Sequence, residues 1–362
     1  MPATTTLLQR VLAAGAALSL VAALGASAGV ARAITPPTIT VLDINPEGDS
    51  YALDDDDTEA VAVGGILLFA AEHYTYGREL YKSDGTVAGT VLVKDINPIG
   101  NSGVEYMVAM GNTAYFQADN GTDGYELWKS DGTEAGTVMV KNINPSGDAS
   151  LRRMVVVGST LYFRANDGTN GAELWKSDGT EAGTVMVKNI NPSADSYPYD
   201  LTVLGTTLYF GADDGTDGEE LWKSDGTTAG TVMVKNIDTA SNSGSVRAIT
   251  RHGNLLYFQA QDAVNGVEMY LSDGTEAGTM RIPAPSATDY ISCDCFDYPV
   301  MSTSIGVFFT YYDSTVGHEL GFIGDRLPET NTNSSALTFA LLALSGALAA
   351  SAVFARRKEL RA

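Results

Sequence analysis

Aspartate and asparagine recur in short glycine-rich loops of this chain, and such oxygen ligands suit a hard cation or the hydroxyls of a sugar. The same residue types also form tight turns, because their side chains bond to nearby backbone and they tolerate positive φ. The repetition of these loops favours turn chemistry, and a weak calcium site is the alternative. The aspartates concerned are Asp119, Asp123, Asp167, Asp213 and Asp217.

A glutamate recurs once in every repeated segment, six times in all. Two carboxylates about 5–10 Å apart could hydrolyse a glycosidic bond. We expect a structural role instead, in which each carboxylate accepts hydrogen bonds from the backbone of an adjacent loop or neighbouring unit. The sequence therefore assigns no catalytic residue. These glutamates are Glu79, Glu126, Glu173, Glu220, Glu268 and Glu319.

Residues that interrupt the repetition are better candidates for function than those that share it. His73 and His318 fall in equivalent loops of the first and last units, and Asp313 is close to the second of them. Together they form a candidate transition-metal site, although isolated loop histidines are usually only exposed. Cys293 and Cys295 lie two positions apart. In an oxidising compartment we expect them to form a disulfide, either with each other or between chains.

All these residues must be positioned by one unit that is repeated six times. A Ser-Asp-Gly-Thr segment recurs at intervals of 47, 47, 47 and 48 residues, and a phenylalanine recurs in six copies. The sixth unit retains Gly317–Leu320 but lacks the Ser-Asp-Gly-Thr segment. The aspartates of this segment are Asp84, Asp131, Asp178, Asp225 and Asp273, and the phenylalanines are Phe69, Phe116, Phe163, Phe210, Phe258 and Phe309.

Each unit has the pattern of four short strands and no helical period. In the third unit we predict strands at Leu151–Val157, Leu161–Asn166, Glu173–Ser177 and Val185–Ile190. Four strands in about 47 residues, repeated, are typical of propeller blades, since one four-stranded sheet cannot bury both faces alone. We therefore predict an all-β fold over residues 34–325, a six-bladed β-propeller of four-stranded antiparallel blades.

The two ends of this array predict how the ring closes. The last unit stops after its third strand, whereas Ile39–Pro46 matches the fourth-strand segment Val185–Pro192. We expect the N-terminal strand to complete the last blade and so remove two exposed edges. In a closed propeller the second-to-third loops and the connections between blades share one face. The aspartate-rich loops would then surround one mouth.

Both chain ends have the pattern of targeting segments. Residues 1–33 contain an apolar stretch without acidic residues, and Ala31 and Ala33 fit the small-residue positions of a signal-peptidase site. Residues 336–355 carry no charge and are long enough for one C-terminal transmembrane helix. The basic tail at residues 356–362 would hold that end in the cytoplasm.

The order of features at the C-terminus resembles the LPXTG cell-wall sorting signal of Gram-positive surface proteins. Residues 326–335 hold the motif and a spacer, followed by the apolar span and the basic tail. The resemblance implies that a sortase attacks the carbonyl of Thr330 and attaches the chain to the cell wall. A plain membrane anchor is the alternative. The motif residues are Leu327, Pro328, Glu329, Thr330 and Asn331, with Asn331 where glycine is usual.

The repeated segment Glu126–Thr133, with near copies at Glu173–Thr180 and Glu220–Thr227, resembles the bacterial ELWxxDGT repeat family. The resemblance extends over residues 38–323. It implies an exported, propeller-like protein, and it implies no substrate.

Composition narrows the function further. The chain has 22 basic and 44 acidic residues, a net charge of −22, and residues 34–330 alone hold 16 basic and 43 acidic residues. This charge excludes a general nucleic-acid binder, and two cysteines exclude a disulfide-rich miniprotein. We predict a binding or adhesion module on the cell surface for a glycan, matrix or envelope ligand. The alternatives are an extracellular hydrolase or lyase acting on polysaccharide and a structural envelope protein.

Overall fold

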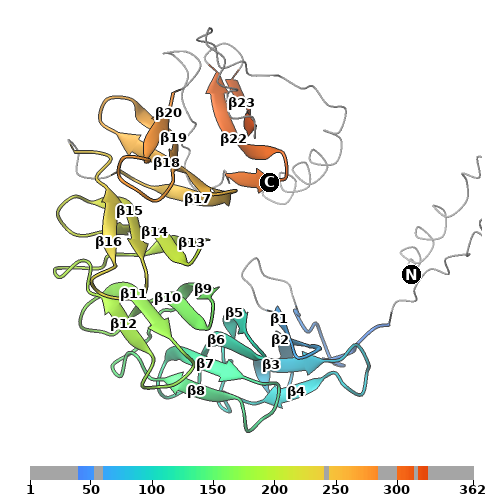
Figure 1. Cartoon of the computed structure of the whole chain (residues 1–362). Coiled ribbons are helices and arrows are strands. Elements are labelled where there is room, and N and C mark those ends of the chain that lie inside the picture. Colours follow the sequence, from blue (N-terminus) through green and yellow to red (C-terminus); the bar gives the residue numbers. More distant parts are fainter. Residues whose placement is uncertain (1–39, 53–59, 240–243, 284–299, 314–316, 325–362) are drawn as a thin grey trace, which may run out of the picture. The chain divides into compact units, whose positions relative to one another are not determined.

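The computed structural model describes residues 40–52, 60–239, 244–283, 300–313 and 317–324, and every regular element in these ranges is a β-strand. Twenty-three strands form six antiparallel sheets in chain order, five with four strands and one with three (Figure 1). Within the described residues we find no helix with the length and apolar character needed to cross a membrane. The predicted transmembrane segment 336–355 lies outside them.

The sheets are numbered here in chain order, with these strands. Sheet 1 contains β1 (Ala60–Val63), β2 (Ile66–His73), β3 (Gly77–Ser83) and β4 (Val91–Lys94). Sheet 2 contains β5 (Glu105–Met110), β6 (Thr113–Asp119), β7 (Tyr125–Ser130) and β8 (Val138–Lys141). Sheet 3 contains β9 (Arg152–Val157), β10 (Thr160–Asn166), β11 (Ala172–Ser177) and β12 (Val185–Lys188). Sheet 4 contains β13 (Tyr199–Leu204), β14 (Thr207–Asp213), β15 (Glu219–Ser224) and β16 (Val232–Lys235). Sheet 5 contains β17 (Arg247–His252), β18 (Leu255–Asp262), β19 (Gly266–Ser272) and β20 (Met280–Ile282). Sheet 6 contains β21 (Met301–Thr303), β22 (Gly306–Asp313) and β23 (Gly317–Gly324).

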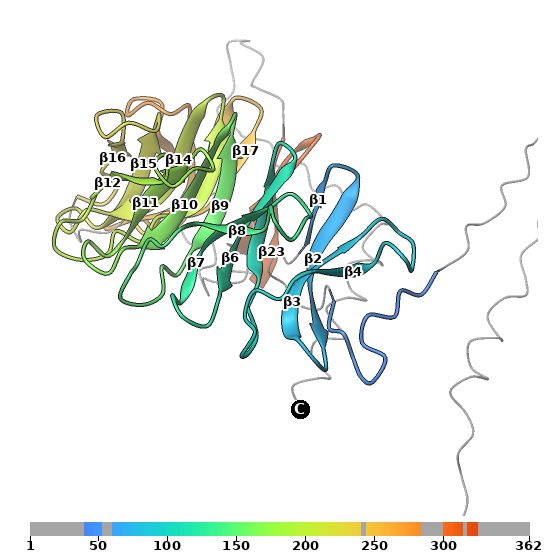
Figure 2. The ribbon, with the colours of Figure 1, turned by 90° about the horizontal axis from the view of Figure 1, so that it is seen from below.

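Each sheet is a meander in which consecutive strands are neighbours, as the order β12–β11–β10–β9 of sheet 3 illustrates (Figure 2). The four strands predicted for this unit are confirmed to within two residues at each end. The fourth strand ends at Lys188 rather than Ile190. It stops early because Glu173 draws the backbone of Ile190 and Asn191 out of the ladder.

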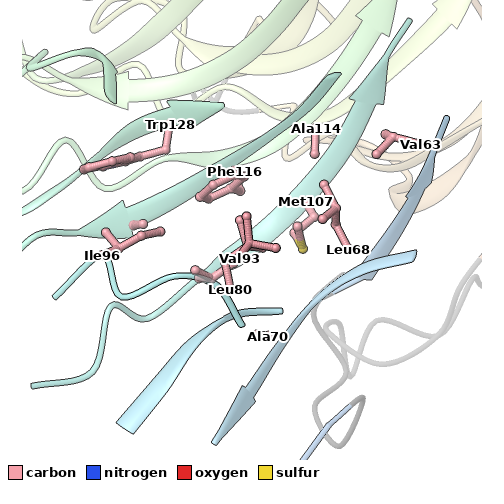
Figure 3. Close-up of a cluster of buried hydrophobic side chains, with 12 residues drawn as sticks. Val63, Leu68, Ala70, Leu80, Val93, Ile96, Met107, Ala114, Phe116 and Trp128 are labelled. Carbon is pink, nitrogen blue, oxygen red and sulfur yellow. The ribbon is translucent and has the colours of Figure 1, made fainter. Parts of the chain in front are cut away.

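Consecutive sheets bury their faces against each other. Separate hydrophobic cores join sheets 1 and 2, 2 and 3, 3 and 4, 4 and 5, and 5 and 6. Figure 3 shows the first core, where Leu80 of sheet 1 and Phe116 and Trp128 of sheet 2 are among the packed side chains. In β9, Met154 and Val156 pack toward sheet 2 while Val155 and Val157 pack toward sheet 4. Each inner sheet is thus apolar on both sides, and the packing order is consistent with a β-propeller.

The Ser-Asp-Gly-Thr segments form compact turns between the third and fourth strands. In sheet 3, Asp178 accepts hydrogen bonds from the backbone N–H and the hydroxyl of Thr180. Gly179 has φ +88, and a side chain there would meet the hydroxyl of Tyr115 from sheet 2. The turn therefore requires glycine both for its backbone conformation and for the close approach of the preceding sheet.

Lysines connect the turns of sheets 2 to 5 to the sheet that precedes each of them. Lys129 of sheet 2 donates to the carbonyl of Gly179 at 2.8 Å, and Lys141 donates to the carbonyl of Thr184 at 2.9 Å. Sheets 1, 3 and 4 repeat the pair, so all eight lysines of the described ranges are used in this way. Sheet 5 has Leu271 and Pro283 at the two lysine positions, and sheet 6 has no such turn to bind.

In the described residues, the N-terminal segment that was predicted to complete sheet 6 forms no strand. Val41–Asp43 have no strand assignment, and the Val41 side chain is 80% exposed. The chain instead packs on sheet 1, where Ile44 contacts the small core around Phe69 and Tyr81. The described residues contain no hydrophobic core between sheets 6 and 1.

Candidate functional site

The repeated glutamates serve the fold, as the structural interpretation predicted. Glu126 is fully buried, and its two carboxylate oxygens accept hydrogen bonds from the backbone N–H groups of Ile143 at 2.6 Å and Asn144 at 3.0 Å. Burial raises the pKa of Glu126 to about 7, although the two backbone donors act in the opposite direction. The corresponding carboxylates of sheets 1, 3 and 4 hold their own connecting loops in the same way. In these four sheets both oxygens are thus committed to backbone donors. Glu268 of sheet 5 departs from this pattern, because it pairs with Arg281 at 3.6 Å and its second oxygen has no hydrogen-bond partner.

The aspartates of the glycine-rich loops also form local hydrogen bonds. Asp167 accepts from the backbone N–H of Thr169 and Asn170 and from the Asn170 amide. Asp119 and Asp213 each accept from a glycine N–H two residues on, at 2.7 and 2.6 Å. Asp123 and Asp217 accept from asparagine amides. Turn chemistry explains these contacts without a ligand.

The described part of the chain contains no cluster of three histidine, cysteine, aspartate or glutamate side chains arranged to hold a metal ion. The His73 ring accepts from the backbone N–H of Thr75 at 3.1 Å and packs on the rings of Tyr74 and Tyr76. His318 lies in β23 opposite Tyr312, and Asp313 ends β22. These positions belong to sheets 1 and 6, which share no core in the described ranges.

Several predicted sites fall outside the described residues. These are the signal-peptidase site at Ala31 and Ala33, the cysteines Cys293 and Cys295, and the sorting motif Leu327, Pro328, Glu329, Thr330 and Asn331.

The first strands of sheets 2 to 5 share an irregular start that carries variable side chains. Each of them has a register shift against its second strand, and a non-glycine residue there adopts positive φ. These residues occupy one position of the repeat, yet their side chains differ completely. The irregular start is thus a repeated feature of the scaffold that presents a different side chain in each of these sheets. The residues are Tyr106 (φ 55), Arg153 (φ 59), Asp200 (φ 52) and Ala248 (φ 55).

A pocket of about 580 Å³ lies where the first strands of sheets 2 and 3 meet, and four of the side chains that line it are Tyr106, Arg152, Arg153 and Arg164. We call these three arginines the arginine cluster. The Arg152 guanidinium lies 4.4 Å from the centre of the Tyr106 ring. The Arg164 guanidinium lies 5.7 Å from the centre of the ring of Tyr197, which is 51% exposed.

The electrostatics of the cluster are unusual for so acidic a chain. Burial lowers the pKa of Arg164, and the positive charges of Arg152 and Arg153 lower it further. Arg153 is 57% exposed and stands 4.0 Å from the Asp200 carboxylate, a loose ion pair. The pocket therefore presents concentrated positive charge beside aromatic rings, a combination suited to an anionic group.

The sequence interpretation missed this site. Its signal was present, since three arginines fall within residues 152–164 of a chain rich in acidic residues. Comparing the six units position by position also isolates Arg164, where sheets 2 and 5 have Gln117 and Gln259. The register shift that brings these side chains together occurs at positions without glycine or asparagine. The sequence therefore gives no signal from which this shift could be predicted.

No protein-family model matches the chain, and the comparison with curated proteins gives no match. Among solved structures, the chain is similar to puromycin hydrolase, at 13% identity and a TM-score of 0.41 over 75% of this chain and 44% of that chain. It is also similar to oligopeptidase B from Leishmania major, at 11% identity and a TM-score of 0.42 over 75% of this chain and 39% of that chain. The chain spans less than half the length of these structures.

Proposed function

We propose that the protein is a non-catalytic binding module displayed on the cell surface, with a glycan or another matrix or envelope ligand. One observation carries the proposal. The recurring glutamates of sheets 1 to 4 accept backbone hydrogen bonds on both oxygens, whereas side chains that differ between the units line a pocket between sheets 2 and 3. A scaffold of invariant units with one irregular pocket suits recognition better than hydrolysis, because the described residues offer no free pair of buried carboxylates.

The proposal includes the family and the closed architecture inferred from the sequence. The ELWxxDGT resemblance supports an exported repeat protein with six blades. Closure is supported by the N-terminal segment, which contacts the first unit as the connection after sheet 1 contacts the second. The backbone N–H of Glu72 donates to the carbonyl of Ser50 at 2.7 Å, and the backbone N–H of Asp119 donates to the carbonyl of Ser102 at 2.8 Å. The N-terminal segment thus behaves as the connection that follows a sixth blade.

A glycan screen tests the function. The full exported chain is presented to neutral and acidic polysaccharides and to matrix proteins, with calcium and with a chelator. Saturable binding without release of shortened products supports a binding module. Released products would assign a hydrolase or lyase instead. Binding that disappears with the chelator would place calcium at the loops of Asp119, Asp167 and Asp213, against the turn interpretation.

We also propose that the exported chain is held at the surface by sortase attachment through Thr330, or else by its C-terminal helix. Cells that express the Thr330→Ala variant are compared with cells that express the unchanged chain. Covalent attachment predicts that detergent extracts the variant and leaves the unchanged chain in the cell-wall fraction. Equal extraction of both chains would assign the plain membrane anchor.

A further inference from the structure

We infer that the arginine cluster, Arg152, Arg153 and Arg164, binds the acidic groups of a polysaccharide, either carboxylates or sulfate esters. The inference rests on the proposed binding function and names its ligand class. Both acidic groups present oxyanions that a planar guanidinium can bind through two parallel N–H donors.

Arg164 is the centre of this argument. Its guanidinium makes no hydrogen bond to any described residue, and its neighbours are the Tyr197 ring and two further arginines. Arginine stays charged in proteins, so half-burying it beside like charges costs free energy. An anion in the pocket would accept hydrogen bonds from this guanidinium and offset the repulsion within the cluster.

Sheet 5 provides an internal comparison. Arg247 occupies the repeat position of Arg152, and the carboxylate of Glu219 from sheet 4 neutralises it at 2.7 Å. The position that corresponds to Glu219 in sheet 2 is Tyr125, a neutral phenol. A carboxylate of the preceding sheet therefore neutralises Arg247, whereas the preceding sheet offers Arg152 no carboxylate at that position.

The lysines cannot supply a similar site. All eight lysines of the described ranges donate to carbonyls of neighbouring turns. With a net charge of −22, the chain repels polyanions at long range. Binding of an acidic polymer must therefore come from short-range contacts at a local concentration of positive charge, and the arginine cluster provides one.

The surroundings favour a sugar over a peptide. The Tyr106 and Tyr197 rings beside the guanidinium groups present flat apolar faces, which suit the C–H faces of a sugar ring. An acidic peptide would also need an apolar anchor site. Met107 is buried, and Val108 and Met154 pack into the core between sheets 2 and 3, so the apolar residues of the pocket are already occupied.

Calorimetry on the full exported chain tests the inference with four probes. These are oligogalacturonate for carboxylates, a heparin-type oligosaccharide for sulfates, neutral dextran, and polyglutamate. We expect binding of one or both acidic sugars and no binding of dextran, and the preferred probe identifies the acidic group. Arg164→Gln should weaken binding at least tenfold, and Arg153→Ala should weaken it by a smaller factor. Both variants place residues that the fold already accepts at these positions, since Gln117 and Gln259 correspond to Arg164 and Ala248 corresponds to Arg153.

Arg251→Ala is the matched control, because Arg251 is exposed on sheet 5 and its side chain donates only to the carbonyl of Gly253. Acidic-sugar binding that survives Arg164→Gln would overturn the assignment to this pocket and leave the binding function intact. Binding of neutral glycans alone would have the same consequence. Polyglutamate binding that is lost in Arg164→Gln, without sugar binding, would make the partner a peptide. Absence of binding to every glycan and matrix probe would overturn the proposed function itself.

Discussion

Individual carboxyl groups buried within the repeats govern how this protein responds to pH. Burial raises the pKa of Glu79, Glu126 and Glu220 to about 7, and it raises the pKa of Glu173 and Glu268 as well. The exposed turn aspartates behave in the opposite way. Hydrogen bonds from the Thr180 side chain and backbone, for example, lower the pKa of Asp178. Glu79, Glu126 and Glu220 therefore titrate near neutral pH, whereas the pKa of the turn aspartates lies below its usual range.

We predict that the protein is less stable at pH 8 than at pH 5.5. A glutamate whose pKa is raised on folding binds its proton more tightly in the folded chain, so the unfolding free energy falls as the pH rises from about 4.5 through about 7. The unfolding midpoint should decrease by roughly 3 °C or more over this interval. Thermal unfolding followed by circular dichroism at pH 5.5, 6.5, 7.5 and 8 measures how the unfolding midpoint changes with pH.

General charge repulsion in an acidic chain has the same sign, so a variant must separate the two effects. The double variant Glu126→Gln and Glu220→Gln removes two titrating groups and two of the backbone hydrogen bonds. It should unfold at a lower temperature throughout and show a shallower pH slope. An unchanged slope would mean that these glutamates do not titrate in this interval.

At the scale of elements, the lysine contacts explain why the units depend on their neighbours. Lys176 of sheet 3 donates to the carbonyl of Gly226 in the turn of sheet 4 at 2.8 Å, and its stem is partly buried. We predict that Lys176→Met, which retains the apolar stem, destabilises the fold by about 1–2 kcal/mol, because a charge-assisted hydrogen bond is lost. Urea unfolding measures the difference in the free energy of unfolding between this variant and the unchanged chain. Arg251→Met should stay within about 0.5 kcal/mol of the unchanged chain, and an equally small effect of Lys176→Met would show that these contacts add no stability.

The sequence predicts the strands well and the irregular strand starts poorly. Alternation and the Asp-Gly turns locate β9 to β12 to within two residues, because these signals are local. The buried Glu126 could also be assigned a structural role, since its repetition argues against a ligand. Arg153 at φ 59 could not be anticipated, because no residue type requires that backbone. Its conformation follows from how β9 shifts its register against β10, which depends on tertiary packing.

At the scale of the whole molecule, two faces have side chains suited to an interface that the described residues do not form. Leu320 of sheet 6 is 72% exposed, whereas the corresponding Leu80, Leu127, Leu174 and Leu221 are fully buried against the next sheet. Val41 is 80% exposed, whereas the corresponding Val187 is 3% exposed. Glu319 is exposed as well, and by its repeat position its partners would be the backbone N–H groups of Ile44 and Asn45. On sheet 1, Phe69 and Tyr81 are only 4% exposed, and Ile44 and Ala52 of the N-terminal segment pack against them.

Substitution of these exposed residues decides whether the ring closes. If sheet 6 packs on sheet 1 with Val41 between them, Leu320→Ala should destabilise the protein by about 2–5 kcal/mol, as for a buried leucine. Val41→Asp should also destabilise it strongly, because it would bury an unpaired charge. If both residues stay exposed, each change should remain within about 0.5 kcal/mol. Val264→Asp is the control, since Val264 is 89% exposed in a loop of sheet 5.

We expect the closed ring to prevail, because closure also covers the outer edge of β23, which is otherwise open to pairing with other chains. Urea unfolding of the four proteins gives the free energies, and a small effect at both Leu320 and Val41 would show that the six sheets form an open array.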